Sequence, residues 1–423
     1  MAFFLLKKDI RKEVIASLYS NRQPFIIHLL KEGPVMKKIG FVILGFILFL
    51  GPLNTAMAQQ TPTICTIHPF TGRFAFAGIE GSAAQQDVVD MANEAGGING
   101  KKIQYYWADG EYKDDVGIAA FKRLYAQYTP QIMFGQSTGM TKALGPEIKS
   151  RYKVLYSVYT MTSEAADPKE NPYLFLAAPT YAEQFGVLLK YIVKEKPGAN
   201  VAFFYSDTEF GREPIVAGRE MCKKMGLKLV AEEVSQVGGV DITTQVLDMK
   251  AKKVDYCIFQ GYVSNPIAAV IKQSKDYGLN AKFMGTFWST ELQLLKELGP
   301  LADEYIGVSA YSFYYEEDLP MIKKIREWTQ KKYPKVEYRS QSYMENFATV
   351  LLFVECFKRA DKMSGGITGD NLVKALQSIK NFDVGGLMPP ISIKSNSIPV
   401  GRVYRGNSKT IRFDPISDWI HMD

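Results

Sequence analysis

The sequence predicts an α/β protein with two lobes, each built on a doubly wound parallel sheet. Two observations support this prediction. Short runs rich in β-branched and aromatic residues alternate with amphipathic stretches of helical period, and such alternation places helices on both faces of a parallel sheet. The alternation also occurs in two series, separated by residues 167–180, which contain three prolines.

The first series predicts the sheet of the first lobe. Its clearest helix carries apolar residues at spacings of three and four between Ala84 and Ala95, which form one apolar face. The runs between the helices have the length of buried strands. The predicted strands are Thr63–His68, Ile103–Ala108, Gln131–Gly135 and Val154–Val158, and the predicted helices are Gly81–Ala95, Asp114–Tyr128 and Thr141–Arg151.

The second series predicts the sheet of the second lobe in the same way. It offers five strand-like runs, each followed or preceded by an amphipathic stretch. The predicted strands are Val201–Tyr205, Lys228–Val234, Tyr256–Gln260, Lys282–Gly285 and Tyr305–Ser309, and the predicted helices are Tyr181–Lys194, Arg212–Met225, Ile242–Lys252, Asn265–Tyr277 and Ser289–Leu298.

Composition excludes several classes of protein. The chain has 423 residues, of which 47% are hydrophobic, so global disorder is excluded. Four cysteines in this length exclude a disulfide-built miniprotein, and we expect them to be buried free thiols. Three histidines argue against a histidine-rich metal site. No metal or cofactor motif is present, so neither is predicted.

The N-terminus has the pattern of an export signal. Residues Ile39–Leu50 form an apolar run that follows two lysines and is short for a membrane span, which needs roughly 20 residues. A small-residue cleavage pattern ends at Ala58, so we predict a signal peptide over 36–58 and a mature protein in the periplasm. The alternative is an N-terminal anchor helix. We further hypothesise that translation starts at Met36 and that residues 1–35 were assigned to the protein by placing the start codon too far upstream.

This leader carries most of the excess charge. The formal net charge of the chain is +7, and residues 1–58 hold eight basic and three acidic residues. The remaining chain is therefore close to neutral. A nucleic-acid-binding surface needs clustered basic residues, and no useful basic run occurs after residue 58. We therefore predict no nucleic-acid partner.

The loops after the strands are the predicted place of function, because doubly wound sheets bind ligands beyond the carboxyl ends of their strands. In the first series these loops are rich in glycine and hydroxyl side chains, and in the second they carry aromatic rings. Helix N-termini attract anions and aromatic walls bury apolar groups, so this combination suits a ligand with an anionic head and an apolar body. The alternative for any single loop is a role in turns and packing.

One short motif offers an alternative function. Residues Gly135–Gly139 match G-x-S-x-G, the nucleophile turn of many hydrolases. Such an enzyme would use Ser137 and needs a histidine later in the chain, and the only one is His421, near the C-terminus; His68 lies upstream. Turn glycines with an anion-binding Ser and Thr explain the motif better, so we predict a protein that is not an enzyme.

A longer motif resembles a known family. Residues Asn93–Ile103 resemble the N-x-x-G-G-I-x-G-(R/K)-x-I signature of periplasmic binding proteins of the leucine/isoleucine/valine family. Pro69–Gly72 is similar to that family's first strand-end loop, Asp207–Gly211 to its D-x-x-(Y/F)-G loop, and Phe283–Gly285 to its F-x-G strand. The resemblance covers essentially all of residues 62–415.

The resemblance implies a type I periplasmic-binding-protein fold, with two lobes joined by a three-segment hinge. Residues 59–178 with 311–390 would form lobe 1, and residues 179–310 with 391–423 would form lobe 2. Such a protein would capture a small-molecule ligand by hinge closure, as a monomer, and deliver it to the permease subunits of an ABC importer at the inner membrane. A ligand-sensing receptor protein with the same fold stays an alternative.

The resemblance and the strand-end loops together give the candidate ligand-binding residues. In the family, a Ser/Thr loop at a helix start in the first lobe holds the ligand carboxylate, a second hydroxyl-bearing loop lies nearby, and aromatic residues come from the second lobe. The predicted ligand-binding residues are Ser137, Thr138, Gly139, Ser157, Tyr159, Thr160, Phe210, Tyr262, Phe287 and Trp288.

One position departs from the family pattern. Amino-acid binders of this family place an acidic residue after the F-x-G strand to pair with the ligand ammonium, and Phe287 stands there instead. A buried ammonium without a carboxylate is unfavourable. Either Glu209 or Glu291 replaces the acid, or the ligand has no ammonium. We favour the second alternative, an aromatic or branched carboxylate, over a hydrophobic or branched-chain amino acid. The family's disulfide near the first-lobe site also has no matching cysteines here.

Overall fold

The computed structural model describes residues 60–72, 74–235 and 242–422, and these residues belong to one structural unit. The predicted signal peptide, the proposed initiator Met36 and the predicted cleavage site after Ala58 lie outside the described residues. Among the described helices, none is both long enough and apolar enough to cross a membrane.

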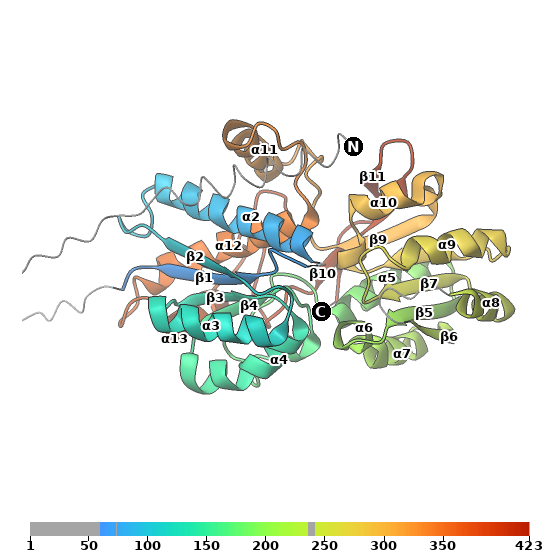
Figure 1. The fold of residues 1–423 in the computed structure, drawn as a ribbon, viewed down its shortest axis with the longest axis horizontal. Helices are drawn as coiled ribbons and strands as arrows, with labels where there is room; N and C mark the ends of the chain where they lie inside the picture. Colours follow the sequence, from blue (N-terminus) through green and yellow to red (C-terminus); the bar gives the residue numbers. More distant parts are fainter. Residues whose placement is uncertain (1–59, 73, 236–241, 423) are drawn as a thin grey trace, which may run out of the picture. The chain divides into compact units, whose positions relative to one another are not determined.

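The first lobe contains a four-stranded parallel sheet in the order β2-β1-β3-β4 (Figure 1). Each strand leads into a helix or a helical turn, so the carboxyl ends of the strands open into loops at one edge. The strands are β1 (Thr63–His68), β2 (Gln104–Asp109), β3 (Ile132–Gly135) and β4 (Leu155–Val158), and the helices between them are α2 (Ala75–Glu94), α3 (Asp114–Tyr128) and α4 (Thr138–Glu147), the last continued by a π-helical turn over Ile148–Tyr152.

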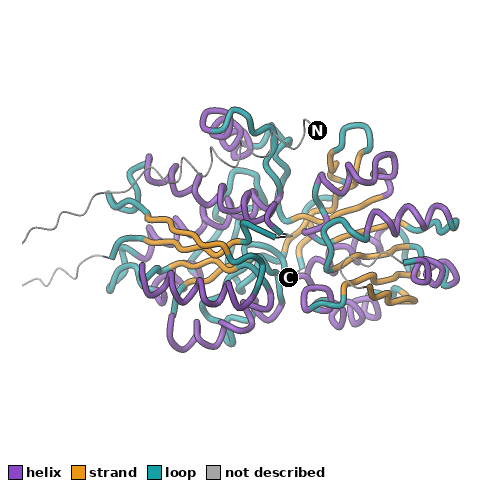
Figure 2. The backbone as a smooth tube through the Cα atoms, viewed as in Figure 1, coloured by secondary structure: helices purple, strands orange, loops and turns teal. Residues whose placement is uncertain are grey.

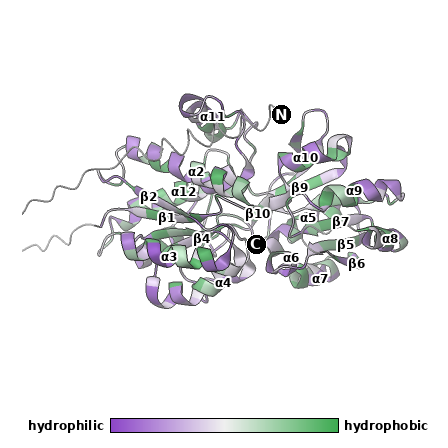
Figure 3. Ribbon diagram, in the orientation of Figure 1, coloured by the Kyte–Doolittle hydropathy of each residue, from purple (hydrophilic) through white to green (hydrophobic). Residues whose placement is uncertain are grey.

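Alternate residues of these strands enter two different cores, because successive side chains of a strand point to opposite faces. Ile64 and Phe134 pack with residues of α2 and of the later helix α12 (Gln341–Ala360), whereas Cys65 and Met133 pack with residues of α3 and α4. The inner strands β1 and β3 therefore carry apolar residues on both faces, and Figure 3 shows that the covering helices carry both hydrophobic and hydrophilic residues.

The second lobe contains a larger sheet in the order β11-β10-β9-β8-β7-β5-β6, with β12 paired to β10. Its five strands β5 to β9 are parallel, and β10 joins antiparallel to β9. The strands are β5 (Asn200–Ser206), β6 (Lys228–Ser235), β7 (Tyr256–Gln260), β8 (Lys282–Gly285), β9 (Tyr305–Ser309), β10 (Val400–Asn407), β11 (Arg412–Pro415) and β12 (Ile420–His421).

Helices cover both faces of this second sheet. Phe204 and Phe259 pack with residues of α8, α9 and α10, whereas Phe203 and Ile258 pack with residues of α5 and α7. The α-helices are α5 (Tyr181–Glu195), α6 (Glu209–Arg212), α7 (Ile215–Lys224), α8 (Thr243–Ala251), α9 (Ile267–Asp276) and α10 (Leu292–Leu298), and 3₁₀ turns lie at Ser163–Ala166, Phe287–Ser289 and Gly299–Glu304.

Three further helices return to the first lobe after β9. They are α11 (Pro320–Lys332), α12 (Gln341–Ala360) and α13 (Gly369–Gln377). The buried helix α12 packs along α2 and contributes to the core on that face of the first sheet (Figure 1). Residues after α13 then lead into β10 of the second sheet.

The chain passes between the two sheets three times, and hydrogen bonds join the three crossing segments. In the segments after β4 and β9, the Tyr311 hydroxyl donates to the carbonyl of Ala177 at 2.6 Å. In the segment before β10, the Ile398 amide donates to the carbonyl of Ala178 at 3.1 Å. Figure 2 shows loops gathered where the two sheets approach each other. The predicted α/β fold with two parallel-sheet lobes is confirmed.

Some predicted helix boundaries were wrong. Helix α2 begins at Ala75 rather than Gly81. Its first turns contain glycines, which allow close packing there: a Cβ on Gly81 would lie 1.3 Å from the Tyr159 hydroxyl oxygen. The predicted helix 212–225 is divided at Pro214, which precedes α7. The predicted helix 289–298 begins only at Leu292, after a 3₁₀ turn.

Candidate functional site

Two adjoining cavities lie between the loops of the two lobes. The larger one, called here the outer cavity, has a volume of about 410 Å³, and the smaller and more enclosed one, the inner cavity, has about 10 Å³. The inner cavity is lined by Pro69, Phe74, Ala77, Tyr112, Gln136, Thr138, Tyr159, Tyr181, Phe210 and Trp288. The outer cavity is lined by Phe74, Tyr112, Asp114, Ser137, Thr138, Gly139, Thr208, Glu209, Phe210, Gly261, Tyr262, Val263, Ser264 and Asn265.

The start of helix α4 forms the polar wall on the side of the first lobe. Ser137 is in extended conformation and caps the helix, since its Oγ accepts a hydrogen bond from the Met140 amide at 3.2 Å. The same hydroxyl donates to Asp114 Oδ1 at 2.5 Å. Gly139 leaves room for this carboxylate, because a Cβ there would lie 2.0 Å from Asp114 Oδ2. A carboxylate of the protein itself therefore sits at this helix start.

A pair of buried threonines lies beside this helix start. The hydroxyls of Thr138 and Thr160 are 2.6 Å apart and share a hydrogen bond. Thr138 belongs to both cavities, and Thr160 lies immediately behind it. Gln136 holds the neighbouring loop in place by donating to the carbonyls of Gly110 and Lys113 at 2.9 and 2.8 Å.

Aromatic rings close the inner cavity. The ring centroids of Tyr159 and Trp288 are 5.7 Å apart, and those of Tyr181 and Phe210 are 5.1 Å apart. Trp288 donates its indole N–H to the Tyr181 hydroxyl at 3.0 Å. Burial raises the pKa of both Tyr159 and Tyr181 above the usual range, so these hydroxyls stay protonated and polar without carrying charge.

Seven predicted ligand-binding residues line these cavities, and three do not. Of the three, Thr160 contacts the lining residue Thr138, and Ser157 is buried within β4, opposite Phe134 of β3. Phe287 is buried, and its amide donates to the side chain of Gln184 at 3.0 Å. The seven are Ser137, Thr138, Gly139, Tyr159, Phe210, Tyr262 and Trp288. That any of the ten contacts a ligand stays a prediction.

Several lining residues were absent from the sequence-based set. Phe74, Tyr112 and Asp114 lie in or directly after strand-end loops of the first lobe, so their position gave a signal, although their residue type did not. Tyr181 gave no such signal. It begins helix α5 directly after a crossing segment and reaches the cavity from there.

The two acids suggested as replacements at Phe287 lie in different surroundings. Glu291 lines neither cavity, and its Oε1 instead accepts a hydrogen bond from the Gln341 amide at 3.1 Å. Glu209 lines the outer cavity, but it accepts a hydrogen bond from Lys142 Nζ at 2.8 Å. This contact lowers the pKa of Glu209 and joins α4 of the first lobe to α6 of the second.

The catalytic triad of the alternative hydrolase is not formed in the described chain, because Ser137 makes no hydrogen bond to a histidine. Ser137 Oγ is engaged by Asp114 and by the Met140 amide. His68 is fully buried beside the Thr66 hydroxyl, and burial lowers the pKa of its imidazole to about 3. His421 is an exposed residue of β12. In the described residues all four cysteines are buried free thiols.

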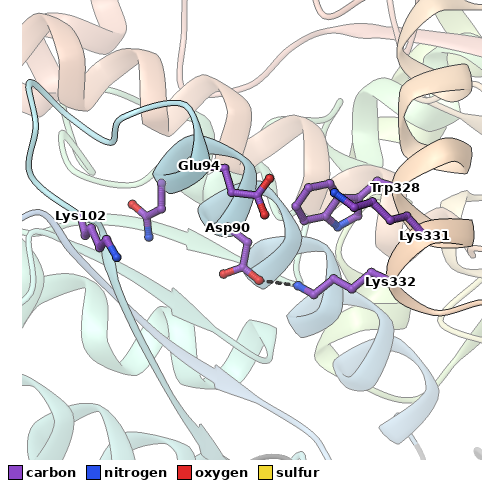
Figure 4. Close-up of a pocket in the computed structure, with 7 residues that line it drawn as sticks. Asp90, Glu94, Lys102, Trp328, Lys331 and Lys332 are labelled. Atoms are coloured by element: carbon purple, nitrogen blue, oxygen red, sulfur yellow. Dashed lines mark hydrogen bonds and ion pairs between the residues drawn. The ribbon is translucent and has the colours of Figure 1, made fainter.

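A third cavity lies elsewhere on the first lobe, between α2 and α11, with a volume of about 530 Å³ (Figure 4). Asp90 and Glu94 of α2 face Trp328, Lys331 and Lys332 of α11 across it. None of the predicted ligand-binding residues lines this cavity.

Two doubly wound lobes, three crossing segments and a cavity between strand-end loops define a two-lobed ligand-binding protein. The chain belongs to the periplasmic binding protein family, whose model matches residues 61–406. The resemblance found in the sequence is thereby confirmed.

Individual relatives are distant. Leu/Ile/Val-binding protein homolog 3 of Brucella melitensis is 22% identical over 57% of this chain and 66% of the relative. A branched-chain amino acid ABC transporter protein from Thermus thermophilus, solved with bound valine, has a TM-score of 0.77 at 24% identity, over 86% of this chain and 97% of that one. A fatty acid ABC transporter substrate-binding protein from Thermomonospora curvata has a TM-score of 0.74 at 19% identity, over 86% and 93%.

Trp288 offers a spectroscopic test of the inner cavity. We expect Trp288→Phe to lose most of any ligand-induced change in tryptophan fluorescence, because this indole lines the cavity and contacts Tyr181. Trp328→Phe on α11 is the matched control and should keep the change, since Trp328 lies at the other cavity. A signal that survives in Trp288→Phe would remove Trp288 from the site.

Proposed function

We propose that this protein is the extracytoplasmic solute-binding component of an ABC importer. It captures a small amphiphilic ligand, either a carboxylate or a hydrophobic amino-acid-like compound, between its two lobes. The proposal rests mainly on one observation: the cavity joins a polar helix start from the first lobe to aromatic residues from the second. The names of the relatives, which include binding proteins for branched-chain amino acids and for a fatty acid, support this range of ligands.

The proposed mechanism is hinge closure without covalent chemistry. Ligand bound to the first-lobe wall gains further contacts when the aromatic residues of the second lobe close over it, and this differential contact favours the closed form. Contacts between the lobes suit such closure. Lys142 joins Glu209, and the Ser163 amide donates to Glu213 Oε1 at 2.6 Å. The closed monomer, working in the periplasm, is then recognised by the permease subunits at the inner membrane.

A thermal-shift screen of the purified protein tests the proposal. Amino acids, aromatic and aliphatic acids, amides and amines are added one at a time. A ligand present at 100 times its Kd adds about 2.7 kcal/mol of stability, so the cognate class should raise the Tm clearly.

Two further results would count against the proposal. One is a screen in which no small solute of any class raises the Tm. The other is covalent labelling of Ser137 by a fluorophosphonate probe, which would favour the hydrolase, because an unactivated serine that caps a helix should not react.

A further inference from the structure

The surroundings of Asp114 indicate which charge the ligand carries. Asp114 is the first residue of α3, and its carboxylate also lies beside the first residues of α4. Helix N-termini stabilise negative charge, so Asp114 lies where two helices favour an anionic group. We predicted from the sequence that Ser137 and Gly139 bind an anionic group of the ligand. The protein's own carboxylate, that of Asp114, already occupies this position.

This arrangement disfavours a ligand carboxylate placed on Ser137. The Ser137 hydroxyl donates its proton to Asp114 Oδ1 at 2.5 Å, so the proton is engaged. An anion at that place would also lie within a few ångströms of Asp114, where like charges repel. A cationic group at the same place would instead form an ion pair with Asp114.

Asp114 is also the acid lining the outer cavity whose charge is available to a cationic group of the ligand. Glu209, the other acid of the outer cavity, is paired with Lys142 Nζ at 2.8 Å. Glu291 lines neither cavity. Among the described residues, Asp114 has no basic partner within ion-pair distance. The second lobe has Phe287 where the family has an acid for the ligand ammonium. Asp114 could form this ion pair from the first lobe instead.

The neighbouring groups leave a separate place for an acceptor. The hydroxyls of Thr138 and Thr160 lie directly beside Ser137, at the border of the two cavities. A ligand ammonium at Asp114 and a ligand oxygen at Thr138 would therefore contact adjacent residues of one helix start. Phe210 lines both cavities, so an apolar body extending from these groups would contact an aromatic ring.

We infer that Asp114 determines specificity by pairing with an ammonium group of the ligand, so that amines and zwitterionic amino acids bind and the matched acids without an ammonium bind poorly. This inference rests on the proposed function. It favours the alternative in which another acid replaces the one absent at Phe287, and it assigns that role to Asp114, which the sequence-based set omitted.

Matched probes test the inference by isothermal titration calorimetry. L-leucine is compared with 4-methylpentanoate, and L-phenylalanine with 3-phenylpropanoate, so that each pair differs by the ammonium alone; 2-phenylethylamine carries only the ammonium. We expect at least one ammonium-bearing probe to bind about tenfold or more tightly than its matched acid, a difference typical of one good ion pair. Acids that bind as tightly as their ammonium partners would overturn the inference.

Two substitutions separate Asp114 from its surroundings. Asp114→Asn keeps the shape and the hydrogen bond from Ser137 but removes the charge, and we expect it to abolish most of the preference for ammonium. Asp115→Asn is the matched control, because it makes the same change at the next residue of α3, which lines neither cavity, and it should keep the preference. A preference that survives in Asp114→Asn, or wild-type protein that binds none of the five probes, would overturn the inference. The proposed function is tested separately, because it survives this result if the wider screen finds a ligand of another class.

Discussion

Replacing Asp87 with alanine is expected to lower the free energy of unfolding by about 3–5 kcal/mol, the range for removing one partner of a buried ion pair. Asp87 is fully buried on α2. Its Oδ2 accepts from the Tyr343 hydroxyl at 2.8 Å, and its Oδ1 lies 3.3 Å from Lys332 Nζ and from the Tyr333 hydroxyl. Arg339 Nη2 lies 3.7 Å from the carboxylate. The substitution would leave these groups without their shared anion.

The neighbouring Asp90 provides a matched control. It contacts the same Lys332, as Figure 4 shows, but its side chain is 33% exposed. Exposed ion pairs contribute little, so Asp90→Ala should cost less than about 1 kcal/mol. Asp87→Asn, which keeps the shape, should fall between the two. Urea unfolding followed by circular dichroism measures all three, and equal effects of Asp87→Ala and Asp90→Ala would show that the buried network is not the cause.

Glu291→Gln is expected to remove a pH dependence of stability between about pH 4.5 and about pH 8. Burial raises the pKa of Glu291 to about 8 in the folded protein. Gln341, whose amide donates to this carboxyl, lies at the start of α12, and the nearby carboxyl of Glu80 raises the pKa further. Arg339 faces Glu80 at 3.4 Å.

The sign follows from proton binding. An unfolded glutamic acid loses its proton near pH 4.3, whereas folded Glu291 keeps it up to about pH 8. Between these values the folded state binds more protons, so the free energy of unfolding falls as the pH rises, by at most about 1.4 kcal/mol per pH unit. Glutamine carries no such proton, so the variant should gain stability relative to the wild type as the pH rises through this window.

The control for this prediction is Glu220→Gln, which makes the same change at an exposed position of α7. Urea unfolding of the wild type and both variants at pH 5, 7 and 9 gives the comparison. If the stability difference between Glu291→Gln and the wild type stays constant over this range after correction by the control, the buried carboxyl does not keep its proton in the folded state.

Local patterns were sufficient to predict most of the two sheets. Strands β7, β8 and β9 have the predicted bounds, because each is a short apolar run between helical patterns. The start of α4 was predicted at Thr141 instead of Thr138, although Ser137 has the residue type of a helix cap after a strand. By contrast, no helix was predicted after residue 310, and residues 311–390 were assigned to lobe 1 only through the family resemblance. Helix α12 is apolar around most of its circumference, which gives a weak periodic signal.

The candidate site was predictable as a set of loops but not as a set of contacts. Asp114 was recognised as a helix start, yet its bond to Ser137 depends on α3 and α4 beginning next to each other in the folded lobe. Ser157 was assigned to the site through the family's second hydroxyl-bearing loop, but its position within β4 buries it in the sheet. Tyr181 reaches the cavity because a crossing segment delivers it there, which is a property of the whole topology.

The three crossings also determine when each lobe can be completed during synthesis. The sheet of the first lobe is made of residues before 160, but the face under α2 is finished only when α12 has been made. The sheet of the second lobe likewise waits for β10, the partner of β9. Contacts this distant in sequence form slowly and leave apolar surface exposed in the meantime. Neither lobe is a contiguous stretch of chain, so a product that terminates before α12 contains neither lobe complete.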